Sequence, residues 1–592
     1  MTVAMRILWC LVSLVIIAGV SPYPEQPEAE LDWWQTTVFY QIYPLSFKDS
    51  SGGGVGDLLG IAEKLEHLKD LGVGGVWLSP IFKSAMADFG YDISDFRDID
   101  PVFGTLAHLD VLLIIANLSD IRVILDFVPN HSSDEHEWFV RSLQREEPFT
   151  NYYTWHDGRV DTAGNRIPPN NWQSVFGGPA WTWRPERNQY YLHQFDPKQP
   201  DLNYGNPLVV EEMKNVLRYW LDKGVDGFRV DAVPHLFEGP IDAPDSETSA
   251  PTHLPETYEM VAEWRKVMDE KSVEYGRTKV LMLETYGTIN QTMGYYGTDD
   301  APGGHFPFNF RLITDINKLS TAEDFSRTIN EYLDVMTDGR TPNWVLGNHD
   351  QHRVASRFSR ELVDGLNFLA HLLPGIGVTY NGEEIGMENT LITWEQCQDP
   401  QGINAGPDHY LEATRDLERT PFQWDNSTSA GFSSNETTWL PVNENYKELN
   451  LEVQKTAAKS HYKVYKQITE LRKTRTIQLG GCQVAALSEN VLAFTRTLES
   501  EDTYVVVINL GDQQETVNVK ATFEYLPDQI TIHIVGVYSG HMAGHSLSTT
   551  SLVLNARESF VFRAESPDVD DSIIILPCSL FIMIIQFVVR YL

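Results

Sequence analysis

Several apolar segments of the sequence end in acidic, amide or imidazole side chains, and this pattern is the first sign of chemistry. Four segments share it, and they supply these residues: Asp126, Asn130 and His131; Arg229 and Asp231; Glu284; and Asn348, His349 and Asp350. A single such group is most simply explained as a structural ion pair at a strand end. Four strands that end alike instead favour an active site with several carboxylates, as glycoside hydrolysis requires.

The surroundings of the carboxylates suggest different roles for them. Arg229 precedes Asp231 by two residues in "GFRVDAV", so both side chains face the same side of a strand. We expect the guanidinium to lower the pKa of Asp231 and keep it ionised, as a nucleophile requires. Glu284 follows the apolar run "VLML", where burial raises a carboxyl pKa and suits an acid catalyst. Asp350 is expected to stabilise positive charge or bind sugar hydroxyls.

The segments that carry these residues alternate with helical patterns between residues 38 and about 385. Eight strand-like segments can be counted, which predicts an α/β fold: a parallel (β/α)₈ TIM barrel. We assign the barrel to residues 32–131 and 204–485. A Trp-, Pro- and Gly-rich stretch, 132–203, is predicted to form a domain inserted after strand 3. Short strands over 486–566 predict a C-terminal antiparallel β-sandwich domain.

The composition limits the classes of partner. The chain has 592 residues, 42% of them hydrophobic, with 15 Trp and a net charge of −37. Such a chain builds a large core. The negative charge argues against nucleic-acid binding, which needs a basic surface, and is compatible with a neutral sugar substrate.

Both ends of the chain carry apolar stretches. Residues 1–20 resemble a signal peptide, and 567–592 resemble a GPI-anchor signal with its hydrophobic tail. They predict a protein on the extracellular face of the plasma membrane. An N-terminal signal anchor and a C-terminal membrane helix stay open as alternatives. Five N-x-S/T sequons fit the secretory route, at Asn117, Asn130, Asn290, Asn426 and Asn435. Cys397 and Cys482 remain in the mature chain, and whether they pair stays open.

The motifs "DFVPNH", "GFRVDAV", "LETYG" and "GNHD" together resemble the four ordered motifs of the α-amylase family of glycoside hydrolases. "QPDLN", "GYDISDF", "FPFNF", "YNGEEIGM" and "RTPFQWD" are similar to its α-glucosidase and oligo-1,6-glucosidase branch. The similarity covers about residues 32–565. In overall character the sequence resembles the membrane-anchored gut maltases of insects such as mosquitoes.

The resemblance implies roles for individual residues. Asp231 would be the nucleophile, Glu284 the acid/base and Asp350 the stabiliser of the transition state. The residues implied to bind the terminal glucose are Asp88, Tyr91, His131, Arg229 and His349, with Arg415 closing the pocket against Asp88. Ala232 is a small residue after the nucleophile, which in related enzymes accompanies α-1,4 rather than α-1,6 linkages.

The resemblance also implies a structural calcium ion. Its ligands would be Asn130, Asp201 and Glu238 with the backbone carbonyls of His235 and Leu236, and a plain hydrogen-bond network is the alternative. A second loop, 49–57, is similar to a calcium loop of bacterial relatives, but only Asp49 and Asp57 are acidic. Since calcium takes six to eight oxygens, a glycine-rich turn is the competing interpretation.

The sequence therefore predicts a retaining exo-α-glucosidase that hydrolyses maltose, maltodextrins and sucrose. The rival class is a cell-surface binding protein or receptor on the same fold, as in amino-acid-transporter heavy chains. Transglycosylation, a toxin ligand and a homodimer stay open.

Overall fold

The computed structural model describes residues 23–25, 31–242, 246, 248–336 and 339–565. The predicted signal peptide and GPI-anchor signal lie outside these residues. Among the described residues, no helix combines the length and the apolar character that crossing a membrane requires.

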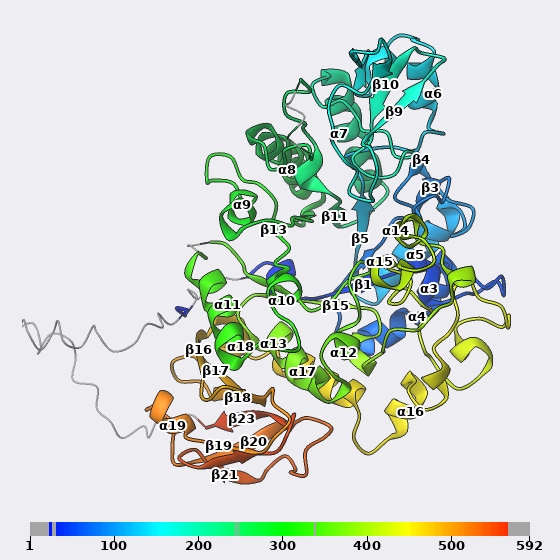
Figure 1. Ribbon diagram of the computed structural model, residues 1–592. Helices are drawn as coiled ribbons and strands as arrows, with labels where there is room; N and C mark the ends of the chain where they lie inside the picture. The colour runs from blue at the N-terminus through cyan, green and yellow to red at the C-terminus, as the bar shows by residue number, and fades with distance from the viewer. Residues whose placement is uncertain (1–22, 26–30, 243–245, 247, 337–338, 566–592) are drawn as a thin grey trace, which may run out of the picture.

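Eight parallel strands form a near-closed barrel, which confirms the predicted fold class (Figure 1). The strands follow one another in the order β13-β12-β11-β5-β2-β1-β15-β14. All eight segments predicted from the sequence are among them: β1 (Val38–Ile42), β2 (Gly75–Leu78), β5 (Arg122–Phe127), β11 (Gly227–Val230), β12 (Val280–Leu283), β13 (Phe306–Pro307), β14 (Asn343–Val345) and β15 (Ile376–Tyr380). Nearly every residue in them is buried, as expected for parallel strands covered by helices.

A helix follows each strand and returns the chain along the outside of the barrel. The main ones are α4 (Leu58–Asp70), α5 (Leu106–Leu118), α7 (Pro207–Asp222), α8 (Pro255–Tyr275), α9 (Ile289–Gly294), α11 (Ala322–Asp334), α13 (Val363–Leu372) and α17 (His461–Leu471). Local sequence sets their ends. Asp57 caps α4, Asn206 caps α7 with Pro207 as its first residue, and Gly276 in the left-handed region ends α8.

The inserted segment between β5 and α7 forms a small sheet that projects beyond the barrel (Figure 1). It contains α6 (Glu137–Leu143), a three-stranded sheet of β6 (Trp155–His156), β10 (Gln189–Leu192) and β9 (Trp181–Arg184), and the ribbon β7 (Arg159–Val160) with β8 (Arg166–Ile167). Trp172, Trp181 and Tyr190 pack in its own small core. A backbone bridge between His131 and Asp201 ties its two ends together.

The C-terminal sheet domain is antiparallel, as predicted, and lies at the other end of the molecule from the inserted segment (Figure 1). Its six strands run in the order β16 (Gly481–Ala486), β17 (Val491–Thr497), β18 (Thr503–Asn509), β23 (Ser559–Ala564), β20 (Gln529–Val535) and β21 (Ser546–Ser548). A ribbon of β19 (Glu515–Val517) and β22 (Leu552–Leu554) shares an apolar core with one face. The other face packs in a core that also contains residues of α11 and α13. Cys397 and Cys482 are free thiols.

Candidate active site

The carboxyl ends of β5, β11, β12 and β14 deliver their polar residues to one cavity of about 400 Å³. All the residues predicted to be catalytic line it: Asp231, Glu284 and Asp350. So do five of the six predicted glucose-binding residues: Asp88, Tyr91, His131, His349 and Arg415. Arg229, the sixth, lies buried directly behind Asp231 and Glu284.

Arg229 holds three carboxylates together. Its Nη1 lies 2.6 Å from Asp231 Oδ1 and 2.9 Å from Asp126 Oδ1, and its Nη2 lies 2.8 Å from Glu284 Oε1. The parallel register sets Arg229 directly opposite Asp126. Asp126 also accepts hydrogen bonds from Trp77 and Tyr91, so its contacts are to other protein groups. It therefore orients its neighbours.

Burial dominates the protonation of the two candidate catalytic carboxyls. Desolvation raises the pKa of Glu284 to about 8, although Arg229 opposes the shift. Desolvation also raises the pKa of Asp231 to about 7, with Arg229 again opposing. The expected net lowering of the Asp231 pKa was therefore wrong, because the site excludes more water than the arginine compensates. The order of the two groups remains as expected: Asp231 loses its proton first, and Glu284 keeps one to higher pH.

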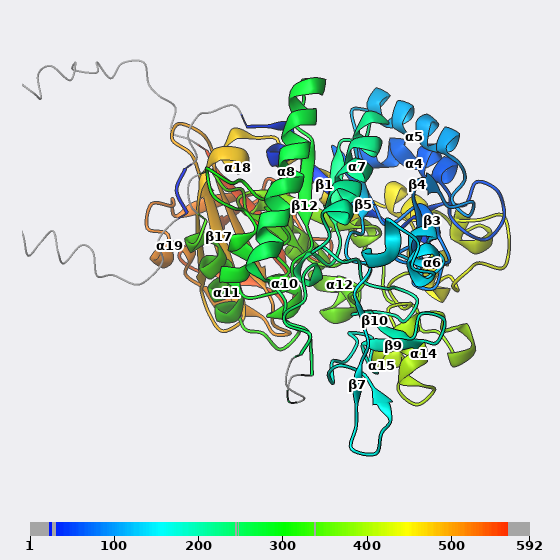
Figure 2. The same ribbon diagram turned by 90° about the horizontal axis from the view of Figure 1, so that it is seen from above.

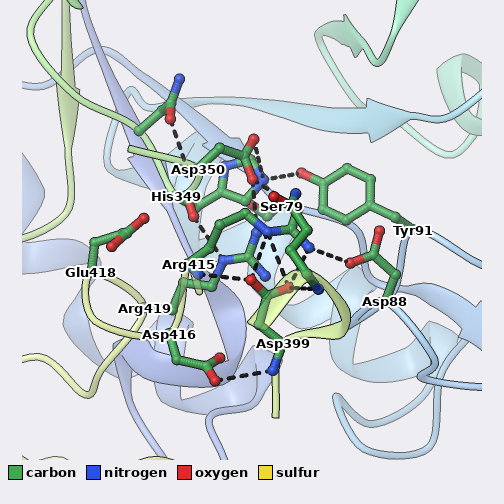
Figure 3. A network of polar contacts seen from close by, with 12 residues as sticks. Ser79, Asp88, Tyr91, His349, Asp350, Asp399, Arg415, Asp416, Glu418 and Arg419 are labelled. Carbon is green, nitrogen blue, oxygen red and sulfur yellow. Dashed lines mark hydrogen bonds and ion pairs between the residues drawn. The ribbon is translucent and has the colours of Figure 1, made fainter. Parts of the chain in front are cut away.

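Asp350 is held by two arginines (Figure 3). Its Oδ1 lies 2.7 Å from Arg419 Nη2 and 3.1 Å from Arg415 Nη1. Burial favours the neutral acid, but the two arginines hold the pKa of Asp350 well below its usual range. Asp350 therefore stays ionised beside the protonated Glu284, which suits a group that stabilises positive charge.

His349 is a neutral donor in a relay of buried side chains. The Gln41 amide lies 2.8 Å from Nδ1 of His349, so the ring carries its proton on Nε2. That nitrogen lies 2.6 Å from the Tyr91 hydroxyl, which donates to Asp126 Oδ2 at 3.2 Å. Tyr91 also stacks on His349, with ring centroids 5.4 Å apart. Burial lowers the pKa of His131 to about 3, and its Nε2 lies 3.0 Å from the Tyr91 carbonyl oxygen.

The residues proposed as calcium ligands lie together where the inserted segment meets the barrel. Asn130 donates to Asp201 Oδ1 at 3.2 Å, and Gln194 donates to Asp201 Oδ2 and to the His235 carbonyl at 2.8 Å each. Burial raises the pKa of Asp201 to about 7, and burial with the nearby Asp201 charge raises that of Glu238 to about 8. The two desolvated carboxylates and the His235 carbonyl have the oxygen chemistry that calcium prefers, whereas the Asn130 and Gln194 amides direct N–H groups at Asp201. The same contacts also make a hydrogen-bond network.

The loop over residues 49–57 is folded around its own carboxylates. Asp49 accepts from the backbone N–H groups of Ser51, Gly52 and Gly54, at 2.7 to 2.9 Å. Asp57 caps α4 by accepting from Gly60 and also accepts from Ser50. With these donors on its oxygens, the loop has the character of a turn.

Several residues of the site were not predicted from the sequence. Asp399 is fully buried and binds Arg415 at 2.6 Å, so Arg415 contacts three carboxylates: Asp88, Asp350 and Asp399 (Figure 3). Arg419 is the first residue of the motif "RTPFQWD", so the sequence could have suggested it. Nothing in the sequence around Asp399 marks it. The inserted segment adds Val175, Phe176, Phe195 and Gln199 to the cavity wall.

Carboxyl groups of different acidity, which lie around one cavity at the carboxyl ends of barrel strands, define a glycoside hydrolase of the (β/α)₈ class. The family model for the alpha amylase catalytic domain matches residues 41–480, and the chain belongs to the α-amylase family. It is 46% identical over 560 residues to Maltase 1 of Drosophila virilis, covering 92% of this chain and 88% of that protein. It is 45% identical to the alpha-glucosidase of Apis mellifera, covering 89% and 93%.

Among solved structures, the chain is similar to the trehalulose synthase MutB from Pseudomonas mesoacidophila. The TM-score is 0.77 at 31% identity, covering 90% of this chain and all of that one. The likeness extends over the barrel and the C-terminal sheet domain, so the architecture described above is that of the family.

Proposed function

We propose that the protein is a retaining exo-α-glucosidase that removes terminal α-1,4-linked glucose from maltose, maltodextrins and sucrose-like substrates. The main support for this proposal is that the Arg229 guanidinium binds both Asp231 and Glu284, and that these two carboxyls line the same cavity. The relatives named maltase and alpha-glucosidase support the α-glucoside specificity.

In the first step, Asp231 attacks the anomeric carbon of the terminal glucose. Oδ1 accepts from Arg229, which leaves Oδ2 as the attacking oxygen. Glu284 donates its proton to the glycosidic oxygen, the bond from that oxygen to the anomeric carbon breaks, and the remaining sugar leaves with the proton. Asp350, ionised by its two arginines, stabilises the positive charge that develops on the ring.

In the second step, Glu284 acts as a base. It takes a proton from a water molecule, whose oxygen attacks the anomeric carbon from the vacated side, and Asp231 departs as a carboxylate. Two displacements at the same carbon restore the original configuration. Both groups return to the protonation states in which they began.

The cavity walls favour exo action on a short substrate. Asp88, Tyr91 and Arg415 line one part of the cavity, and the inserted segment supplies Phe176 and Phe195. With a volume of about 400 Å³, the cavity is suited to one or two sugar units. A non-reducing end would enter this closed pocket, and the rest of the chain would extend toward solvent.

Glucose release from maltose tests the proposal. We expect Asp231→Asn to lose at least about a thousandfold in kcat, since the nucleophile is removed without a change of shape. Proton NMR of the wild-type reaction on an aryl α-glucoside, whose leaving group is not a sugar, should show α-glucose first, because of the double displacement. Equal activity of the variant, or β-glucose as the first product, would overturn the mechanism. On concentrated sucrose, product analysis separates hydrolysis from transglycosylation.

We also propose that calcium binds Asn130, Asp201 and Glu238 with the carbonyls of His235 and Leu236. The ion would offset the repulsion between two buried carboxylates and fasten the inserted segment to the barrel. EGTA should then lower the melting temperature, and added calcium should restore it. Elemental analysis that finds no calcium in the purified protein would favour the hydrogen-bond network.

For the location, we propose a GPI-anchored protein on the outer face of the plasma membrane. The support is the pair of apolar end segments in the sequence. Phosphatidylinositol-specific phospholipase C should release the protein from membranes. Retention after this treatment would contradict the anchor.

A further inference from the structure

Helix α5 carries an exposed apolar stripe that the rest of the fold leaves uncovered. Its sequence is LAHLDVLLIIANL, and its inner face, with Leu109, Leu112 and Ala116, is buried. On the outer face Val111, Ile114 and Leu118 are 40%, 60% and 78% exposed. Their spacing of three and four residues places them along one line of the helix surface. A helix that is apolar all round is normally covered on both sides.

Helix α5 lies on the outside of the barrel, beside α4 and away from the C-terminal sheet domain (Figure 2). No other part of the described chain packs against the three side chains closely enough to bury them. Its cover must therefore come from something beyond these residues.

A glycosylation sequon stands within the stripe. Asn117, Leu118 and Ser119 form the motif N-x-S, and the Asn117 side chain is exposed in the last turn of α5. Asn117 follows Ile114 by three residues, so its side chain lies next to that of Ile114, at the edge of the stripe. By contrast, the sequon at Asn130 is only 2% exposed, and its amide donates to Asp201, so it is shielded from modification.

A second copy of the chain is a poor cover for the stripe. A stable interface buries roughly 800 Å² on each partner, and three partly exposed aliphatic side chains fall well short of that area. The net charge of −37 also opposes the approach of an identical chain. A group attached to the helix itself needs neither a large interface nor charge complementarity.

We propose that Asn117 carries an N-linked glycan whose first sugars lie over the stripe formed by Val111, Ile114 and Leu118. The N-acetyl methyl groups and the C–H faces of the pyranose rings would contact the aliphatic side chains, and the hydroxyls would face water. The glycan would thus cover an exposed apolar surface, which favours aggregation, with a hydrated one. This role is independent of hydrolase activity.

The glycan is transferred to Asn117 from a lipid-linked oligosaccharyl diphosphate, and the reaction is balanced. The amide nitrogen of Asn117 forms a bond to the anomeric carbon of the first sugar and loses one proton. The bond from that carbon to the diphosphate oxygen breaks, and the lipid diphosphate leaves. No oxidation or reduction is involved.

Site occupancy is the first test. The full chain is produced in insect cells, purified and digested, and its glycopeptides are measured by mass spectrometry. We expect Asn117 to be modified in most molecules and Asn130 to be unmodified. Glycans at Asn290, Asn426 or Asn435 with none at Asn117 would overturn the inference and leave the secretory route standing. If no sequon carries a glycan, the result would contradict both the glycan at Asn117 and the secretory route.

The covering role is the second test, read out by the fluorescence of a dye that binds apolar surfaces. Asn117→Gln and Ser119→Ala both destroy the sequon, and we expect each to raise dye fluorescence at least about twofold. Ser119→Thr keeps the sequon and should match wild type. Adding Ile114→Glu and Leu118→Glu to Asn117→Gln should return the signal to the wild-type level.

Glycan removal from the folded wild-type protein separates this effect from misfolding. Peptide-N-glycosidase treatment should reproduce the rise in fluorescence while the circular dichroism spectrum stays unchanged. A glycan that is present on Asn117, but whose loss leaves dye binding unchanged in both the variants and the treated protein, would show that it does not cover the stripe.

Discussion

At the scale of single residues, burial and neighbouring charges determine which carboxyl groups of the site are protonated. Glu284 and Asp231 both bind Arg229, yet burial raises the pKa of each. Asp350 binds two arginines, and its pKa falls. One cavity therefore holds a carboxyl that keeps its proton beside one that is always ionised, as acid and electrostatic catalysis together require.

These pKa shifts predict the pH dependence of activity. Asp231 must be ionised, so activity should appear as pH rises through its pKa, about 7 in the free enzyme. Glu284 must be protonated, so activity should fall as pH rises through its pKa, about 8. A plot of kcat/KM against pH for maltose should be a bell with both limbs above the ordinary carboxyl range. Limbs near pH 4 would contradict the desolvation of the site.

Asp399 is predicted to position Arg415. It is fully buried and accepts from Nε and Nη2 of Arg415, which in turn contacts Asp88 and Asp350. Asp399→Asn should raise KM for maltose by about tenfold or more, with a smaller change in kcat, because Arg415 loses its anchor against the glucose-binding wall. Asp408→Asn, an exposed acid nearby, is the matched control and should behave as wild type. An unchanged KM for Asp399→Asn would show that the other two carboxylates suffice to place the arginine.

At the scale of elements, short turns after the strands decide the geometry of the catalytic groups. Ala232 follows β11 in the left-handed region, with φ of 47°, and its N–H donates to Glu284 Oε2 at 2.8 Å. The turn thus links the strand of the nucleophile to the strand of the acid. Left-handed backbone is strained for a residue with a branched Cβ.

This turn predicts that two substitutions of Ala232 differ in their effect. Ala232→Val should cost about 1 to 3 kcal/mol of unfolding free energy and lower kcat for maltose, because valine resists this backbone and displaces the N–H from Glu284. Ala232→Gly should keep stability within about 1 kcal/mol, since glycine adopts the conformation freely. Urea unfolding and the relative rates on maltose and isomaltose check both. A valine variant as stable as wild type would argue that the turn changes conformation without strain.

At the scale of the whole molecule, the barrel and the C-terminal sheet domain share one core. Phe494 and Ile508 of the sheet are buried in the same apolar cluster as Phe325 of α11 and Leu369 of α13. The Arg496 guanidinium donates across the boundary to the Leu372 carbonyl at 2.7 Å. The sheet therefore covers barrel helices that would otherwise expose apolar surface.

Removing the sheet domain should therefore unfold the barrel. A chain of residues 31–480 is expected to aggregate or to lose its cooperative thermal transition, while residues 31–565 should fold. Phe494→Ala should cost about 3 to 5 kcal/mol, and Val553→Ala, 43% exposed, under about 1 kcal/mol. Circular dichroism melting curves provide the measurement. A stable, active 31–480 fragment would show that the shared core is dispensable.

The sequence by itself determined the barrel, the antiparallel C-terminal domain and the three carboxyl residues at the centre of the cavity. Strand alternation and polar strand ends are local patterns, and the four motifs placed Asp231, Glu284 and Asp350 on defined strands. Even the orienting role of Asp126 could be inferred, because a charge inside an apolar run needs buried partners.

Only the tertiary structure determined the pKa values of the buried carboxyls and the contacts between residues that are distant in sequence. The net rise of the Asp231 pKa follows from how completely the packed strands exclude water, which no neighbouring residue in sequence reports. Asp399 reaches Arg415 because the segment after β15 folds back through α14 (Pro400–Ala405) and α15 (Tyr410–Ala413) and brings the two side chains together at the cavity. The exposed stripe on α5 likewise became visible only once the fold left it uncovered, since an apolar helix in sequence simply predicts burial.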